Sequence, residues 1–149
     1  PAAFVSSSLY LLEIELDESD DTIVVRSEYY DEERTVYMDG SEHPASNQRF
    51  ATGHSIGRWH EDTLIVDTTN FTDHRSPYQI GVPSGAQKRV IETYRLNDEG
   101  TGINATFVLE DPEYLAEPMH HARELVYSPH LEMFVAGCDP TATSRFLEQ

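Results

Sequence analysis

The chain has 149 residues, about the size of one domain. Its 27 acidic residues outnumber its 10 lysines and arginines, and the resulting formal net charge of −17 repels nucleic acids and anionic membrane surfaces. Hydrophobic residues make up 38% of the chain, enough for one core, but no run approaches the roughly 20 apolar residues of a membrane span. The single cysteine excludes an internal disulfide. We therefore expect one soluble domain over residues 1–149, with no nucleic-acid partner and no membrane contact.

Alternation of apolar and polar residues with a period of two dominates the sequence and predicts short strands separated by polar turns. Strands are expected at residues 10–16, 22–30, 34–38, 54–59, 63–71, 88–96, 103–109, 120–127 and 131–136. One helical turn is expected within 111–118. The polar tail from about Asp139 is expected to be peripheral.

Eight or nine short strands, joined mostly by tight links, predict an all-β antiparallel meander. A meander of this length closes into a barrel or folds into a sandwich. We expect a small barrel, because closure removes exposed edges and eight strands leave room for a core or one small ligand; a β-sandwich is the alternative. In architecture such a barrel resembles the lipocalin-like barrels. The connection over 72–87 is long enough to be a functional loop.

One segment resembles the signature of a bacterial family. Residues 53–71 read G-H-S-I-G-R-W-H-E-D-T-L-I-V-D-T-T-N-F, and residues 34–40 and Asp111-Pro112 with Tyr114 also match its pattern. The resemblance spans roughly residues 10–118. The family is uncharacterised, so the resemblance implies no activity. Its longer members often carry a secretion signal, whereas no charged-then-apolar signal segment opens this sequence.

The hairpin within this signature carries the first candidate catalytic pair. His54 begins one predicted strand and Asp67 lies within the apolar run of the next. A carboxylate that fixes the tautomer of an imidazole is the standard unit of general acid–base catalysis. These two side chains meet only if a bulge or a diagonal reach brings them together. The alternative is a surface ion pair or a polar cluster whose hydrogen bonds are satisfied.

Glu92 and Tyr94 form a second candidate proton-transfer pair, because both share a strand face with Val90 and Leu96 that is otherwise apolar. Burial would raise the pKa of such a carboxyl group toward the working range. The alternative is an edge position at which Glu92 reaches water. Candidate residues for lining a ligand pocket are the aromatic residues Trp59, Tyr37 and Phe71.

His74 and Arg75 lie in the long connection, where they could contact an anionic substrate at the barrel mouth; a solvated loop pair is the alternative. No histidine pair has the spacing of a metal site, and adjacent His120 and His121 point to opposite faces of a strand, so no metal is expected. Nucleotide-binding and nucleophile-elbow motifs are absent, and no cofactor is expected.

Three functions remain open from the sequence. The first is a cofactor-independent enzyme (lyase, isomerase or hydrolase) acting by general acid–base chemistry on a small, partly apolar organic molecule. The second is a passive carrier of a small apolar ligand, which needs a cavity with few convergent polar groups. The third is a structural or interaction module with a filled interior. A homodimer is compatible with each of them.

Overall fold

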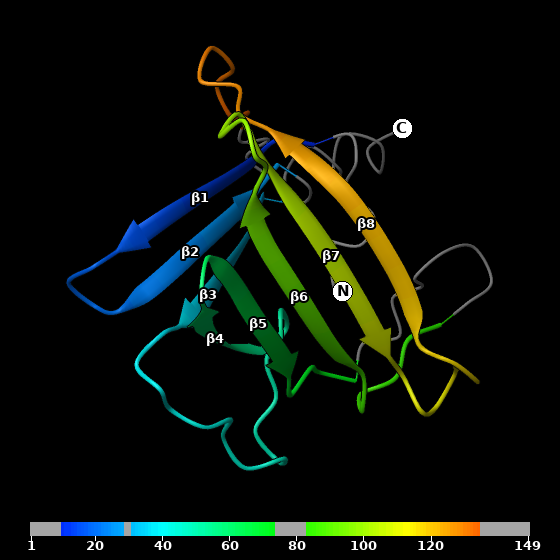
Figure 1. Ribbon diagram of the computed structural model, residues 1–149. Coiled ribbons are helices and arrows are strands. Elements are labelled where there is room, and N and C mark those ends of the chain that lie inside the picture. Colours follow the sequence, from blue (N-terminus) through cyan, green and yellow to red (C-terminus); the bar gives the residue numbers. More distant parts are fainter. Residues whose placement is uncertain (1–9, 29–30, 74–82, 135–149) are drawn as a thin grey trace, which may run out of the picture.

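The alternating pattern folds into eight strands that form a single sheet (Figure 1). The computed structural model describes residues 10–28, 31–73 and 83–134. Neighbours in the sheet follow chain order from β1 to β8. The strands are β1 Leu12–Asp17, β2 Thr22–Ser27, β3 Glu32–Tyr37, β4 His54–His60, β5 Thr63–Thr69, β6 Arg89–Leu96, β7 Gly102–Glu110 and β8 Met119–Val126.

The sheet curls into a half-barrel, in which β1 and β2 run at a steep angle to β6, β7 and β8 (Figure 1). The all-β meander expected from the sequence is confirmed. β1 and β8 are the end strands of the sheet order, so among the described residues the sheet is curled but not closed by strand pairing. Glu28, after β2, accepts hydrogen bonds from the backbone N–H groups of Leu11 and Phe134 and so links the segments before β1 and after β8.

One strand pair departs from the antiparallel expectation. β3 and β4 are parallel and match at two positions, Val36 with Ser55 and Tyr37 with Ile56. A parallel pair requires a connection that returns the chain to the end at which the first strand began. Residues 38–53 make this return. The Asn70 side-chain amide holds them in place by donating hydrogen bonds to the carbonyl oxygens of Pro44, Ala45 and Gln48.

The apolar faces of the strands meet on the concave side of the sheet. One group of buried side chains comprises Ile23, Val25, Val36, Leu64, Val66, Ala105 and Phe107. A second, smaller group comprises Phe71, Val90 and Leu109. The faces expected from alternation in β2, β6 and β7 are therefore the faces that the structure buries.

Two expectations near the C-terminus have different outcomes. Residues 131–134 form no strand, so the ninth strand expected at 131–136 is wrong over that part, and residues 135 and 136 lie outside the described residues. Leu131 is instead drawn into a turn by a hydrogen bond from its N–H to the Ser128 carbonyl oxygen. Within 111–118, the Leu115 N–H donates to the Asp111 carbonyl oxygen, which closes a single helical turn. The tail from Asp139 lies outside the described residues.

Gly57 allows β3 and β4 to approach closely. A Cβ atom at this position would lie 2.8 Å from Val36 Cγ1 and against Met38 Sδ, closer than side chains pack. We expect Gly57→Ala to lower the free energy of unfolding by about 1–3 kcal/mol through overpacking. Denaturant unfolding measures this loss. The control is Arg58→Ala at the next, exposed position, expected to change stability by less than about 0.5 kcal/mol; equal effects of the two substitutions would contradict the close approach.

Candidate functional site

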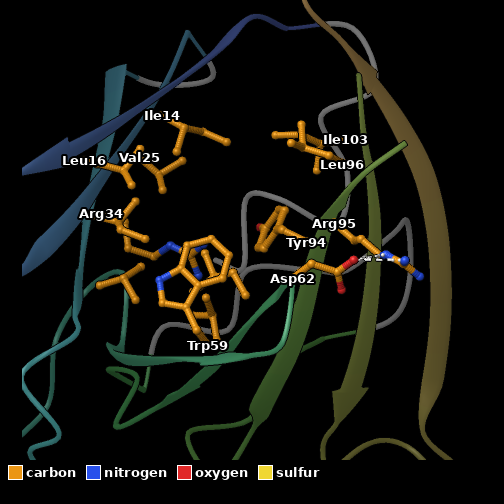
Figure 2. A pocket seen from close by; sticks show the side chains of 14 residues that line it. Ile14, Leu16, Val25, Arg34, Trp59, Asp62, Tyr94, Arg95, Leu96 and Ile103 are labelled. Atoms are coloured by element: carbon orange, nitrogen blue, oxygen red, sulfur yellow. Dashed lines mark hydrogen bonds and ion pairs between the residues drawn. The ribbon is translucent and has the colours of Figure 1, made fainter. Parts of the chain in front are cut away.

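The concave face encloses a cavity of about 240 Å³ (Figure 2). Side chains from β1, β2 and β3 form one wall, and side chains from β4 to β7 form the other. Most of the lining is aliphatic, including Ile14, Val25, Val36, Leu64 and Ile103. The cavity is therefore mainly apolar, with four polar or charged side chains around it: Arg34, Asp62, Tyr94 and Arg95.

A buried ion pair lies beside this cavity. Arg34 on β3 donates to both carboxylate oxygens of Glu92 on β6, at 2.5 and 3.2 Å. Glu92 is 0% exposed and Arg34 only 5%. The Tyr94 hydroxyl donates to Glu92 at 2.9 Å, and Arg34 also donates to the Thr68 hydroxyl at 3.3 Å. The guanidinium, carboxylate and phenol thus form one hydrogen-bonded, electrically neutral cluster.

The electrostatics of the cluster keep its protons in place. Burial disfavours the charge on Arg34, but the attraction and hydrogen bonds of Glu92 and Tyr94 together outweigh it and hold the pKa of Arg34 above its ordinary value. Burial also raises the pKa of Tyr94, and the charge of Glu92 adds to the rise while Arg34 opposes it. Tyr94 therefore stays protonated near neutral pH and acts as a hydrogen-bond donor rather than as a base.

Exposed apolar side chains mark the mouth of the cavity. Leu16, Trp59 and Leu96 all line it and are 62%, 56% and 62% exposed. Asp62 and Arg95 form an ion pair at the same rim, with 2.9 Å between Oδ2 and Nη2 (Figure 2). Because both partners are exposed, this pair contributes little stability. Trp59, expected from the sequence to line a pocket, does so.

His54 and Asp67 lie on the convex face, away from the cavity, and do not contact each other directly. The strand register places Asp67 opposite Ile56, and His54 opposite Thr69. Asp67 is held by Arg89, with hydrogen bonds of 2.6 and 2.8 Å.

His43, from the connection before β4, stands between the two expected partners. Its Nδ1 atom lies 3.1 Å from Nδ1 of His54, and its Nε2 atom lies 3.9 Å from the Asp67 carboxylate. The expected histidine–aspartate pair is thus replaced by a chain of three groups that includes His43, which the strand pattern does not single out.

His54 sits in a partly buried aromatic setting. The Tyr37 ring stacks on it with 4.9 Å between centroids, so Tyr37 lies on the convex face and does not line the cavity as expected. Burial lowers the pKa of His54, the neighbouring His43 lowers it further, and Asp39 partly opposes the shift.

The remaining expected site residues fall elsewhere. Phe71 is fully buried against Val90 and Leu109, beneath the Lys88 ammonium group, and does not line the cavity as expected. His74 and Arg75 lie outside the described residues. Within the ranges described, no three or more His, Cys, Asp or Glu side chains are placed to hold a metal ion.

Arg34 is the principal site residue that was not anticipated. Alternation places it two positions before Val36, on the same inward face. An arginine that shares the inward face of a strand with a buried valine is the pattern by which the sequence could have identified Arg34. Glu92 and Tyr94 do share the inward face as expected, and the new observation is that a cation joins them.

No protein-family model, curated protein or solved structure gives a significant match to this chain. The resemblance of residues 53–71 to a bacterial family signature therefore stays a prediction. In the described part of the chain, no helix is long and apolar enough to cross a membrane.

The ion pair yields a stability prediction. We expect Arg34→Met to lower the free energy of unfolding by about 3–5 kcal/mol, because it leaves the Glu92 carboxylate buried without its cation. Adding Glu92→Leu should restore much of that loss, since an apolar pair needs no hydration. Urea unfolding of the single and double variants measures both effects. A double variant no more stable than Arg34→Met would show that the buried charge is not the cause.

Proposed function

We propose that this protein binds a small, uncharged, mainly apolar organic molecule in the concave cavity. The observation that carries the proposal is the cavity's mainly aliphatic lining, whose two arginines are each paired with a carboxylate. Ligand sites of this kind combine apolar walls with a few placed polar groups. In this cavity the residues that carry polar groups are Tyr94, whose hydroxyl bonds to Glu92, and the Asp62–Arg95 pair at the rim.

The volume limits the size of the ligand. A dry apolar cavity of roughly 150 Å³ holds one benzene molecule. Scaled in proportion, 240 Å³ accommodates about ten non-hydrogen atoms, with further atoms able to extend through the mouth. This is the size of a bicyclic hydrocarbon or a small terpenoid rather than of a drug-sized molecule.

Charge argues for a neutral ligand. The net charge of −17 opposes the approach of anions. Arg34 and Arg95 already neutralise Glu92 and Asp62, so a bound anion would have to displace a carboxylate from one of them. A cation would leave water for a mainly apolar cavity and meet no carboxylate without a partner, which costs free energy.

The contacts favour binding without turnover over acid–base catalysis. Asp67 and His54 are on the opposite face of the sheet from the cavity. Glu92 is fully buried behind Arg34 and Tyr94 and does not line the cavity. An interaction module with a filled interior is also not favoured, because the interior is hollow.

Camphor and camphor-10-sulfonate share one bicyclic skeleton, to which the second adds an anionic sulfonate group, so the pair compares a neutral probe with a bulkier, charged one. We expect camphor to bind and to change the fluorescence of Trp59, the only tryptophan of the chain, which lines the mouth. We expect the sulfonate to bind at least about tenfold more weakly, a difference of about 1.4 kcal/mol. Fluorescence titration measures both affinities; a sulfonate that binds as tightly as camphor would contradict the preference for a neutral ligand.

A blocking substitution tests the location. Ile103→Phe adds bulk at a cavity-lining position of β7 and should weaken camphor binding by about tenfold or more. Val108→Phe is the matched control, because Val108 is on the same strand but on the convex face. Unchanged affinity in Ile103→Phe, or an equal loss in both variants, would place the ligand elsewhere.

A further inference from the structure

The junction between β3 and β4, formed by Val36, Tyr37, Ser55 and Ile56, is the shortest strand pairing in the described sheet. It matches two positions. The flanking pairs β2–β3 and β4–β5 match six and seven positions. We call this junction the β3–β4 seam. Because it has the fewest matched positions, the seam depends more than the other pairings on side chains that cross it.

Two histidines reinforce the seam on the convex face. His54 begins β4 and stacks on Tyr37, the last residue of β3. His43, in the returning connection, meets the same imidazole through the 3.1 Å contact between Nδ1 atoms, and the Phe50 ring lies 5.7 Å from it. The His54 ring is therefore a point at which side chains of β3, β4 and the connection meet.

The contact between the two imidazoles depends on their protonation. One Nδ1 atom must carry a hydrogen and donate the hydrogen bond, and the other must be unprotonated and accept it. The pair accommodates one additional proton on an outer nitrogen, but a second leaves two cationic rings with N–H groups facing each other at 3.1 Å. Double protonation therefore replaces a hydrogen bond by a repulsion.

Other charges around the pair do not remove this conflict. Asp67 on β5 lies 3.9 Å from His43 but is already paired with Arg89 on β6, which also approaches Glu110 on β7. Asp39, in the connection, attracts a proton to His54, yet burial and His43 still leave the pKa of His54 below its ordinary value of 6.5. Because the fold lowers the pKa of His54, it favours the neutral imidazole. The contribution of this preference to the free energy of unfolding is fully present above pH 6.5 and is lost as the pH falls below that value.

The cavity lies directly across this seam. Arg34 and Val36 line it from β3, whereas Trp59 and Leu64 line it from β4 and β5. Any loosening of the β3–β4 seam moves one wall of the cavity relative to the other. A ligand that contacts both walls would then lose part of its contacts.

We propose that the His43–His54 pair is an acid-sensitive latch that holds the β3–β4 seam closed over the bound ligand and releases the ligand when both imidazoles are protonated. The latch regulates the binding proposed above and rests on that function. Near neutral pH the pair is hydrogen-bonded and the two walls form one site. In acid the imidazoles repel each other and the site opens at the seam.

Camphor titrations at pH 7.5 and pH 5.0 test the latch. We expect the wild-type affinity to fall about tenfold at pH 5.0, as when only about one tenth of the molecules keep a competent site. His43→Gln retains a hydrogen-bonding partner for His54 but cannot become charged, and His54→Phe retains the stack on Tyr37 without a titrating group. Both variants should lose most of the pH effect, whereas His120→Gln on β8 should retain it.

Hydrogen exchange of the free protein separates the latch from the ligand. After correction for the intrinsic effect of pH on exchange, amides of β3 and β4 should lose protection at pH 5.0 in the wild type but not in His43→Gln. If camphor fails to bind at pH 7.5 while these amides still open in acid, the cavity function is wrong and the acid-sensitive seam stands. If the two variants keep the wild-type pH effect on affinity, or if the seam amides stay protected in the wild type, the latch is wrong.

Discussion

The buried pair of Arg34 and Glu92 is the interaction on which the concave side of the sheet depends. It reaches from β3 to β6, across β4 and β5, and so ties the two parts of the half-barrel together beneath the cavity. Both charges are removed from water, so each requires the other. The same pairing neutralises Arg34 and so leaves the residues around the cavity without net charge. This is the condition that the proposed binding of a neutral, apolar ligand requires.

The alternation of residue types predicts the strands and their faces but not how the strands pair. The two-residue period shows which side chains share a face, and β2, β6 and β7 bury the faces that it predicts. It does not contain the direction of a strand relative to its neighbour. The parallel pairing of β3 and β4 follows from the return of residues 38–53, and that return depends on hydrogen bonds from Asn70, which lies far away in the sequence.

The same limit explains which site residues could be predicted. Glu92 and Tyr94 are two positions apart on one strand, so alternation alone places them on one face, and the structure joins them by a hydrogen bond. His54 and Asp67 are on different strands, and their meeting depends on register. The register offsets them by two positions on the convex face, where the fold inserts His43 from a connection that strand patterns do not describe.

The two faces of the β3–β4 seam carry polar contacts of different kinds. On the concave side, Arg34 keeps its charge, because its pKa is raised, and it donates to the Glu92 carboxylate. On the convex side, the His54 imidazole, whose pKa is lowered by burial and by His43, contacts the His43 ring through the two Nδ1 atoms. β3 is thus held on the concave side by the ion pair to β6, and its junction with β4 is held on the convex side by the contact between the two imidazoles, which the proposed latch makes dependent on pH. Loss of the outer contact alone loosens the seam without separating the sheet, because the inner pair continues to bridge β3 and β6. A reversible change in the cavity, rather than unfolding, is the consequence that this arrangement favours.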